Sequence, residues 1–148
     1  MNILDLASMS VLLAYIIPPI LFATTKNMIH LKAFIGLLAT SVISESLKYN
    51  FIGEKGPRPF GATYCNLFCN DGNQAGRPGM PSSHSAEAAF IVGYYYQLID
   101  NKYIRLSLLF YAASIMLSRY LKSCHSIPQI IVGALLGLFL SWIVVKIE

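Results

Sequence analysis

Long apolar runs separated by short polar segments dominate the chain. A helix needs roughly 20 apolar residues to cross the hydrocarbon core of a bilayer, and five runs approach that length. They lie approximately at Met9–Thr25, Leu31–Lys48, Ser83–Leu98, Ile104–Tyr120 and Ile127–Ile147. The third run is the weakest, because it is short and begins with polar residues. Since backbone amides inside a bilayer must be hydrogen-bonded within the segment, each run is predicted to be a helix.

One long polar stretch, Phe51–Ser82, separates the second run from the third. Only 12% of the 148 residues are charged and 55% are hydrophobic, whereas average soluble domains carry about 25% charged residues. No internal repeat is visible, and the first residues, MNILD, lack the basic start of a secretory signal. We therefore expect residues 1–148 to form a single all-α integral membrane domain. It would be a bundle of about five transmembrane helices, anchored by its first span, with a polar loop between the second and third.

The basic residues are scattered at the ends of the runs, so the net charge of +4 does not suggest nucleic-acid binding. An odd number of spans places the second-to-third and fourth-to-fifth connections on one side, together with the N-terminus. Outside the candidate site residues, this side carries Lys55, Arg77 and Lys122, and the other side carries Lys26, Lys32, Lys102, Arg105 and Lys146. Because cytoplasmic loops are enriched in Lys and Arg, the polar loop is predicted to lie away from the cytoplasm.

The three cysteines provide no disulfide framework. Cys65 and Cys69 lie in the polar loop and would pair if that loop faces an oxidising compartment. The alternative is two free loop cysteines, which we favour.

The two polar connections on one side are predicted to face each other. The first ends in RPGMPSSHS and the second reads SRYLKSCHSIPQ, so both contain His and basic residues beside hydroxyls. Lys48, Arg58 and Arg119 offer fixed positive charge, which suits phosphate oxygens. Ser83 and the free amides at the start of the third helix add donors for an anion. This set favours a phosphoryl group, and without a cluster of acidic ligands a magnesium-dependent mechanism is not expected. No cofactor is expected.

Two histidines suit the two steps of phosphoryl transfer, because their pKa lies near neutrality. Gln129 follows His125 by one helical turn, where its amide oxygen would hold one ring nitrogen. This favours His125 as the nucleophile and His84 as the general acid. Taken singly, each residue has a plainer reading: a packed histidine, a helix cap, or interfacial anchors at Arg119 and Lys122. Their convergence on one side of the membrane favours a site.

These motifs resemble those of the type 2 phosphatidic acid phosphatase family, the lipid phosphatases related to vanadium haloperoxidases. That family's pattern is Lys, six residues, Arg-Pro; then Pro-Ser-Gly-His; then Ser-Arg, five residues, His, three residues, Asp. Here the second part reads Pro81-Ser82-Ser83-His84, and the third reads Ser118-Arg119, five residues, His125, three residues, Gln129. The resemblance extends from Lys48 to Gln129. It implies a phosphohistidine at His125, an acid at His84, phosphate binding by Lys48, Arg58, Ser83 and Arg119, no metal, and a helical bundle commonly of six spans.

Three departures from this pattern refine the expectation. Lys48 lies ten positions before Arg58 and Lys55 only three; we prefer Lys48, because it ends an apolar helix, and infer three extra loop residues. Ser83 replaces the motif glycine, and Gln129 replaces the aspartate. Both changes resemble dolichyl-diphosphatase-like members, which points to a polyprenyl or dolichyl diphosphate, with a phosphatidic acid-type substrate as the alternative.

Two other classes of function remain open. One is a catalytically inactive relative that binds phosphorylated lipids or scaffolds partners, motivated by the missing aspartate. The other is a small channel or metal carrier that uses Cys65, Cys69, His84 and His125, although these residues lack a convincing ligand spacing. The expected partners are a phosphorylated lipid and the bilayer. Gly133 and Gly137 form a small-xxx-small step that predicts close helix packing inside the bundle.

Overall fold

The structure is a computed structural model that describes residues 2–147, and within them it is helical, without a strand. Its six α-helices are α1 (Ile3–Met9), α2 (Leu12–Thr25), α3 (Met28–Ser46), α4 (Ser83–Leu98), α5 (Lys102–Leu121) and α6 (Ile127–Lys146). The third helix continues into a π-helical segment, Leu47–Ile52, and a 3-10 turn, Gly53–Lys55. The irregular loop 56–82 follows and leads into α4.

The predicted membrane helices are present, although not all have the length of a span. Met28–Lys55, Lys102–Leu121 and Ile127–Lys146 are long and apolar enough to cross a bilayer. The pair α1 and α2 adds a fourth if it is counted as one span bent by 41°. The protein is therefore an all-helical integral membrane protein. With 16 residues, α4 is only about 24 Å long, so the count of five spans stays a prediction.

The first apolar run begins differently from the prediction. Met9 was expected to open one continuous helix, but it is the last residue of the separate helix α1, and α2 starts at Leu12. A capping box explains the earlier start, because Asn2 accepts a hydrogen bond from the amide of Asp5 while the Asp5 side chain accepts from the amide of Asn2. Residues 3–9 thus form a short helix that hydropathy alone did not separate.

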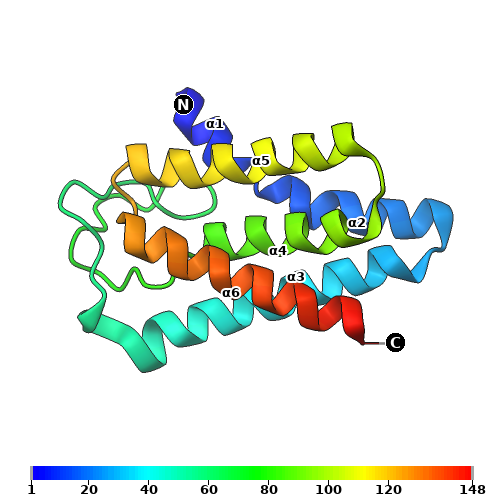
Figure 1. The fold of residues 1–148 in the computed structure, drawn as a ribbon. Coiled ribbons are helices and arrows are strands. Elements are labelled where there is room, and N and C mark those ends of the chain that lie inside the picture. Colours follow the sequence, from blue (N-terminus) through cyan, green and yellow to red (C-terminus); the bar gives the residue numbers. More distant parts are fainter. Residues whose placement is uncertain (1, 148) are drawn as a thin grey trace.

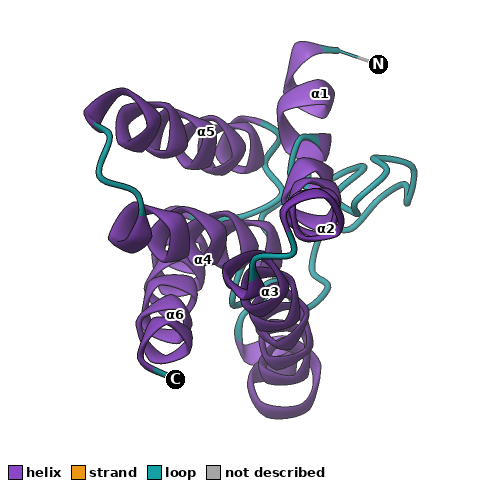
Figure 2. Ribbon diagram, turned by 90° about the vertical axis from the view of Figure 1, so that its right-hand side faces the viewer, coloured by secondary structure: helices purple, strands orange, loops and turns teal. Residues whose placement is uncertain are grey.

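The helix α4 occupies the centre of the bundle. Its bounds agree with the predicted run, and every residue from Ser83 to Tyr95 is buried. Figure 2 shows α4 enclosed by α3, α5 and α6, with α2 beyond it. This surrounding explains why the run lacks a polar face: α4 meets protein on all sides over its first three turns.

Two glycines of α6 allow that helix to approach α4 closely. A methyl group added at Gly133 would collide with the carbonyl oxygen of Ser82, and one at Gly137 with the carbonyl oxygen of Ala86. The obstacles are backbone atoms, which cannot move aside independently. The predicted role of the small-xxx-small step in packing inside the bundle is confirmed.

Replacing Gly137 by alanine should therefore destabilise the bundle. We expect a loss of about 1–3 kcal/mol, as for overpacked cores, measured as a lower thermal unfolding midpoint in detergent. Leu135→Ala is the matched control, because Leu135 lies on the same helix with its side chain exposed on the outer face. A Gly137→Ala protein as stable as the Leu135→Ala protein would contradict the close α4–α6 contact.

The two polar connections lie at one end of the bundle. Figure 1 shows the loop 56–82 and the α5–α6 connection at the left, and the α2–α3 and α4–α5 connections at the right. The amide of Ser82 donates to the carbonyl of Gln129 at 3.0 Å, which joins the start of α4 to the start of α6. The helix α1 contacts the same end, because Asp5 forms an ion pair of 2.7 Å with Lys122.

The cysteine prediction was wrong. Cys65 forms a disulfide with Cys124, and Cys69 has a free thiol. Spacing within the loop suggested Cys69 as the only partner for Cys65, because Cys124 is 59 residues further along the chain. The fold brings Cys124 to the loop, since the α5–α6 connection lies directly against it.

Candidate functional site

A cavity of about 310 Å³ lies between the loop and the bundle. Five of the seven residues predicted for the site line it: Lys48, Arg58, Ser83, His84 and His125. Lys48 comes from the end of α3, Ser83 and His84 from the first turn of α4, and the other two from the loop and the α5–α6 connection. Segments up to 77 residues apart in sequence, from position 48 to 125, thus meet around one polar cavity.

His125 and Gln129 interact as their spacing predicts. The Gln129 side-chain oxygen lies 3.2 Å from Nδ1 of His125 and also accepts from the amide of Ser126 at 3.1 Å. Since an amide oxygen only accepts, His125 must carry its proton on Nδ1 to make this bond. Its Nε2 is then unprotonated, with its lone pair beside the cavity, where it accepts a long hydrogen bond of 3.5 Å from Nη1 of Arg58.

The Gln129 amide is held in one orientation. Its nitrogen donates to the carbonyl of Gly56 at 3.2 Å and to the carbonyl of Pro57 at 2.7 Å. Carbonyl oxygens cannot donate, so a flipped amide would lose both bonds and bring oxygen against oxygen. The loop 56–57 therefore fixes the oxygen of Gln129 toward His125, which sequence reasoning had left open.

The surroundings of His125 favour its neutral form. Its side chain is buried, and the guanidinium groups of Arg119 and Arg58 lie nearby. Burial first, then these positive charges, hold the pKa of His125 well below its usual value. Arg58 Nη1 lies 3.5 Å from Nε2 of His125, and burial also lowers the pKa of Arg58. A neutral imidazole beside fixed cations can act as a nucleophile toward an anion.

His84 faces the cavity with one ring nitrogen unpartnered. Ser82 caps α4 and accepts from the amide of Ser85, which places His84 in the first turn of the helix. His84 is only 8% exposed, and its Nε2 has no hydrogen-bond partner within residues 2–147. A buried, unpaired ring nitrogen that lines a cavity is available to a group bound there.

Lys48, and not Lys55, reaches the site. Lys48 is buried, and its Nζ donates to Ser83 Oγ and to Glu45 at 2.6 Å each; Ser83 also donates to Glu45. Lys55 is exposed. The π-helical segment 47–52 and the 3-10 turn 53–55 take up chain between Lys48 and Arg58, consistent with the longer spacing. Lys48 and Glu45 form an ion pair, and both side chains line the cavity.

Arg119 is placed behind the cavity instead of on its wall. It is fully buried, its Nη1 donates to Ser8 at 2.5 Å, and its Nη2 donates to the carbonyl of Cys65. The Nε atoms of Arg119 and Arg58 have no partner among the described residues. Sequence reasoning missed Ser8 and Cys65, because neither carries a motif and Ser8 lies 111 residues from Arg119.

Acidic side chains near the cavity do not form a metal-binding group. Glu45, Asp71 and Glu87 line it, and Glu87 is only 5% exposed. Within residues 2–147, no three His, Cys, Asp or Glu side chains gather closely enough to hold a metal ion. The metal-carrier alternative therefore has no ligand set in this part of the chain.

The fold and site together define a class: a helical membrane protein with a polar cavity at one end of the bundle, lined by two histidines, a hydroxyl and charged side chains of both signs. The family comparison agrees with this class. The PAP2 superfamily model matches residues 9–148, so the chain belongs to the PAP2 superfamily. Membership supports a phosphatase function of the lipid phosphatase type. Comparisons with curated proteins and with solved structures returned no significant match.

Proposed function

We propose that this protein is a lipid phosphatase that works through a phosphohistidine at His125 and needs no metal ion. The observation that carries the proposal is the orientation of His125. Gln129 holds its Nδ1, and the loop carbonyls of Gly56 and Pro57 hold Gln129. The unprotonated Nε2 then lies beside the guanidinium of Arg58, where the charge of a phosphate group would be neutralised.

The reaction has two steps. In the first, Nε2 of His125 attacks phosphorus, the bond from phosphorus to the leaving oxygen breaks, and His84 gives a proton to that oxygen. In the second, water attacks the phosphohistidine, the neutral His84 takes the water proton, and the nitrogen–phosphorus bond breaks to release phosphate. Lys48, Arg58 and Arg119, with Ser83, stabilise the charge on the phosphoryl oxygens in both steps. Arg119 would do so with its unpartnered Nε or after exchanging a present contact.

A lipid-linked substrate agrees with a second cavity, of about 270 Å³, between α2, α4 and α5. Glu87 of α4 lines the polar cavity, while Ile91 and Tyr95, one and two turns further along the same helix, line the apolar one. Both cavities thus lie along α4, so a phosphate bound in the first would have an apolar cavity for a lipid chain further along the same helix. We favour a polyprenyl or dolichyl diphosphate, because Ser83 and Gln129 stand at the motif positions that resemble dolichyl diphosphatases.

The missing aspartate motivates the alternative of an inactive lipid-binding relative. The pinned amide of Gln129 weighs against it, because the oxygen supplies the hydrogen bond that an aspartate would supply. What the amide lacks is the negative charge that stabilises the phosphorylated imidazole. The proposal therefore predicts a working enzyme whose rate depends on Gln129.

The test is phosphate release by the purified full chain in detergent, with a panel of phosphorylated lipids and EDTA present. We expect release from a polyprenyl diphosphate and inhibition by vanadate, which mimics the trigonal-bipyramidal phosphorus. Activity that disappears in EDTA and returns with a divalent cation would refute the metal-independent mechanism. Tight lipid binding with no release would favour the inactive relative.

We also propose that the site faces away from the cytoplasm. The charge distribution supports this orientation, and a disulfide beside the site suits an oxidising compartment. In a Cys69→Ser background, a cysteine placed at the exposed Asn73 should react with an impermeant thiol reagent from the non-cytoplasmic face. A cysteine at Asp100, at the opposite end, is the matched control and should react from the cytoplasm. The reverse pattern would overturn the orientation.

A further inference from the structure

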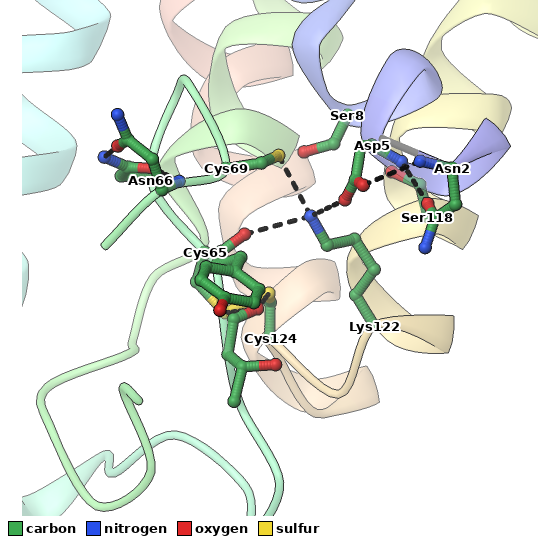
Figure 3. Close-up of polar contacts among 12 residues, drawn as sticks. Asn2, Asp5, Ser8, Cys65, Asn66, Cys69, Ser118, Lys122 and Cys124 are labelled. Atoms are coloured by element: carbon green, nitrogen blue, oxygen red, sulfur yellow. Dashed lines mark hydrogen bonds and ion pairs between the residues drawn. A yellow bond between two sulfur atoms is a disulfide. The ribbon is translucent and has the colours of Figure 1, made fainter. Parts of the chain in front are cut away.

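The disulfide between Cys65 and Cys124 lies against the groups that we assign to phosphate chemistry. Cys124 immediately precedes His125, and Cys65 lines the polar cavity. Figure 3 shows the bond beside the end of α5, where Lys122 contacts Asp5 and Cys69. Both half-cystines are buried, at 2% and 0% exposure. The bond is therefore an internal part of the site and not a surface clip.

Each half of the disulfide also contacts an arginine through its backbone. The carbonyl of Cys65 accepts from Nη2 of Arg119, and the carbonyl of Cys124 accepts from Nη1 of Arg58 at 3.5 Å. The amides of Cys124 and His125 both donate to the carbonyl of Arg119, at 3.0 and 3.3 Å. One covalent bond thus joins the two backbone positions that orient both guanidinium groups and the imidazole.

Other contacts do not hold these two positions together equally well. The amide of Cys65 donates to Asp71 at 2.6 Å, but Asp71 belongs to the same loop, so this bond does not tie the loop to the α5–α6 connection. Between the end of α5 and the loop, Lys122 Nζ donates to the carbonyl of Tyr64 at 2.9 Å and to Cys69 Sγ at 2.9 Å. A lysine ammonium on a flexible stem restrains direction weakly. The disulfide is the covalent restraint between the loop and the α5–α6 connection.

We propose that the Cys65–Cys124 disulfide is a positioning element for Arg119 and His125, so that activity depends on its oxidised state. This inference rests on the proposed function. Reduction by a dithiol transfers two electrons and two protons to the bond, giving two cysteine thiols and the cyclic disulfide of the reductant. The loop is then free to move Cys65 away from Arg119, and the cationic site loses its alignment with His125. Errors of about 1 Å in such a site cost on the order of 100-fold in rate.

The experiment uses the full chain in detergent with Cys69→Ser, which removes the remaining thiol at a residue that does not line the cavity and leaves a hydroxyl oxygen to accept from Lys122. The protein is assayed oxidised, after dithiol reduction, and after reoxidation, with the bond monitored by mass spectrometry of alkylated peptides. We expect kcat to fall at least about tenfold on reduction and to return on reoxidation. The Cys65→Ser/Cys124→Ser variant should match the reduced protein and ignore the reductant. Vanadate affinity should fall in parallel, while the thermal unfolding midpoint remains well above the assay temperature.

The outcomes separate this inference from the proposed function. Full kcat and unchanged vanadate affinity in protein shown to be reduced would overturn the positioning role, although the phosphatase would stand. An oxidised protein without any phosphatase activity would contradict the proposed function. In that case the loss of vanadate affinity on reduction still decides whether the disulfide orders the anion site. Recovery of only the thermal midpoint on reoxidation, without recovery of kcat or vanadate affinity, would reduce the bond to a purely structural role.

Discussion

Replacing His125 by alanine should abolish phosphate release, with a loss of at least about 1,000-fold in kcat, because no other group can form the covalent intermediate. The imidazole is held at Nδ1 by Gln129 and flanked by Arg58, so its removal leaves the polar cavity without a nucleophile. Vanadate binding should also weaken, whereas the helical content and the elution volume in detergent should not change. The matched control is Ile127→Ala, two residues away, whose side chain is 54% exposed on α6. A His125→Ala protein with full activity would rule out the phosphohistidine.

His84→Ala should give a different defect, because it removes the acid and not the nucleophile. With a lipid diphosphate, both protonation of the leaving oxygen and activation of water are lost. With nitrophenyl phosphate the leaving group needs little protonation, so we expect the first step to survive and produce a burst of about one nitrophenol per chain. His125→Ala should show no burst. Equal bursts in the two variants would contradict the division of roles.

Replacing Gln129 by alanine should lower kcat at least about tenfold, which is roughly 1.4 kcal/mol of barrier. Without the amide, His125 loses the acceptor that fixes its tautomer, and the carbonyls of Gly56 and Pro57 lose their donor. In a serine protease, the change of the orienting aspartate to asparagine costs about 10⁴. The loss should be smaller here because the parent already works with a neutral acceptor. Gln97→Ala, at the exposed far end of α4, is the matched control.

Gln129→Asp should retain activity but shift its pH dependence. A carboxylate stabilises the charged imidazole, so the pKa of His125, which lies well below its usual value in the parent, should rise. At a given acidic pH, less of His125 is then neutral, and the acidic limb of kcat/KM should move to higher pH. A Gln129→Ala protein that turns over like the parent, or a Gln129→Asp profile that does not move, would deny Gln129 an orienting role.

Much of the fold and part of the site were predictable because they depend on local patterns. Apolar runs form helices in a membrane because the backbone amides and carbonyls there must hydrogen-bond within the segment. The bounds of α4 were predicted correctly from such a run. The interaction of His125 with Gln129 follows from a spacing of one helical turn. Lys48 was preferable to Lys55 since it ends an apolar helix, and the structure places it beside Ser83.

The other features of the site depend on contacts between residues far apart in the chain, which the spacing of motifs along the sequence does not reveal. Cys124 could not be matched to Cys65 without knowing that the α5–α6 connection lies against the loop. Arg119 was expected to bind phosphate directly, yet its partners come from α1 and from the loop backbone, where no motif marks Ser8 or Cys65. The orientation of the Gln129 amide is set by two carbonyls more than 70 residues earlier. The sequence therefore indicated which residues form the site, but not the contacts that orient their side chains.

Trapping of the phosphoenzyme tests the central claim most directly. The His84→Ala protein, incubated briefly with radiolabelled nitrophenyl phosphate in EDTA and quenched in base, should retain about one phosphate per chain. Peptide mapping should place that phosphate on His125, as an acid-labile, base-stable linkage that the His84→Ala/His125→Ala protein cannot form. A label on Ser83, or nitrophenol release without any bound phosphate, would contradict the phosphohistidine mechanism.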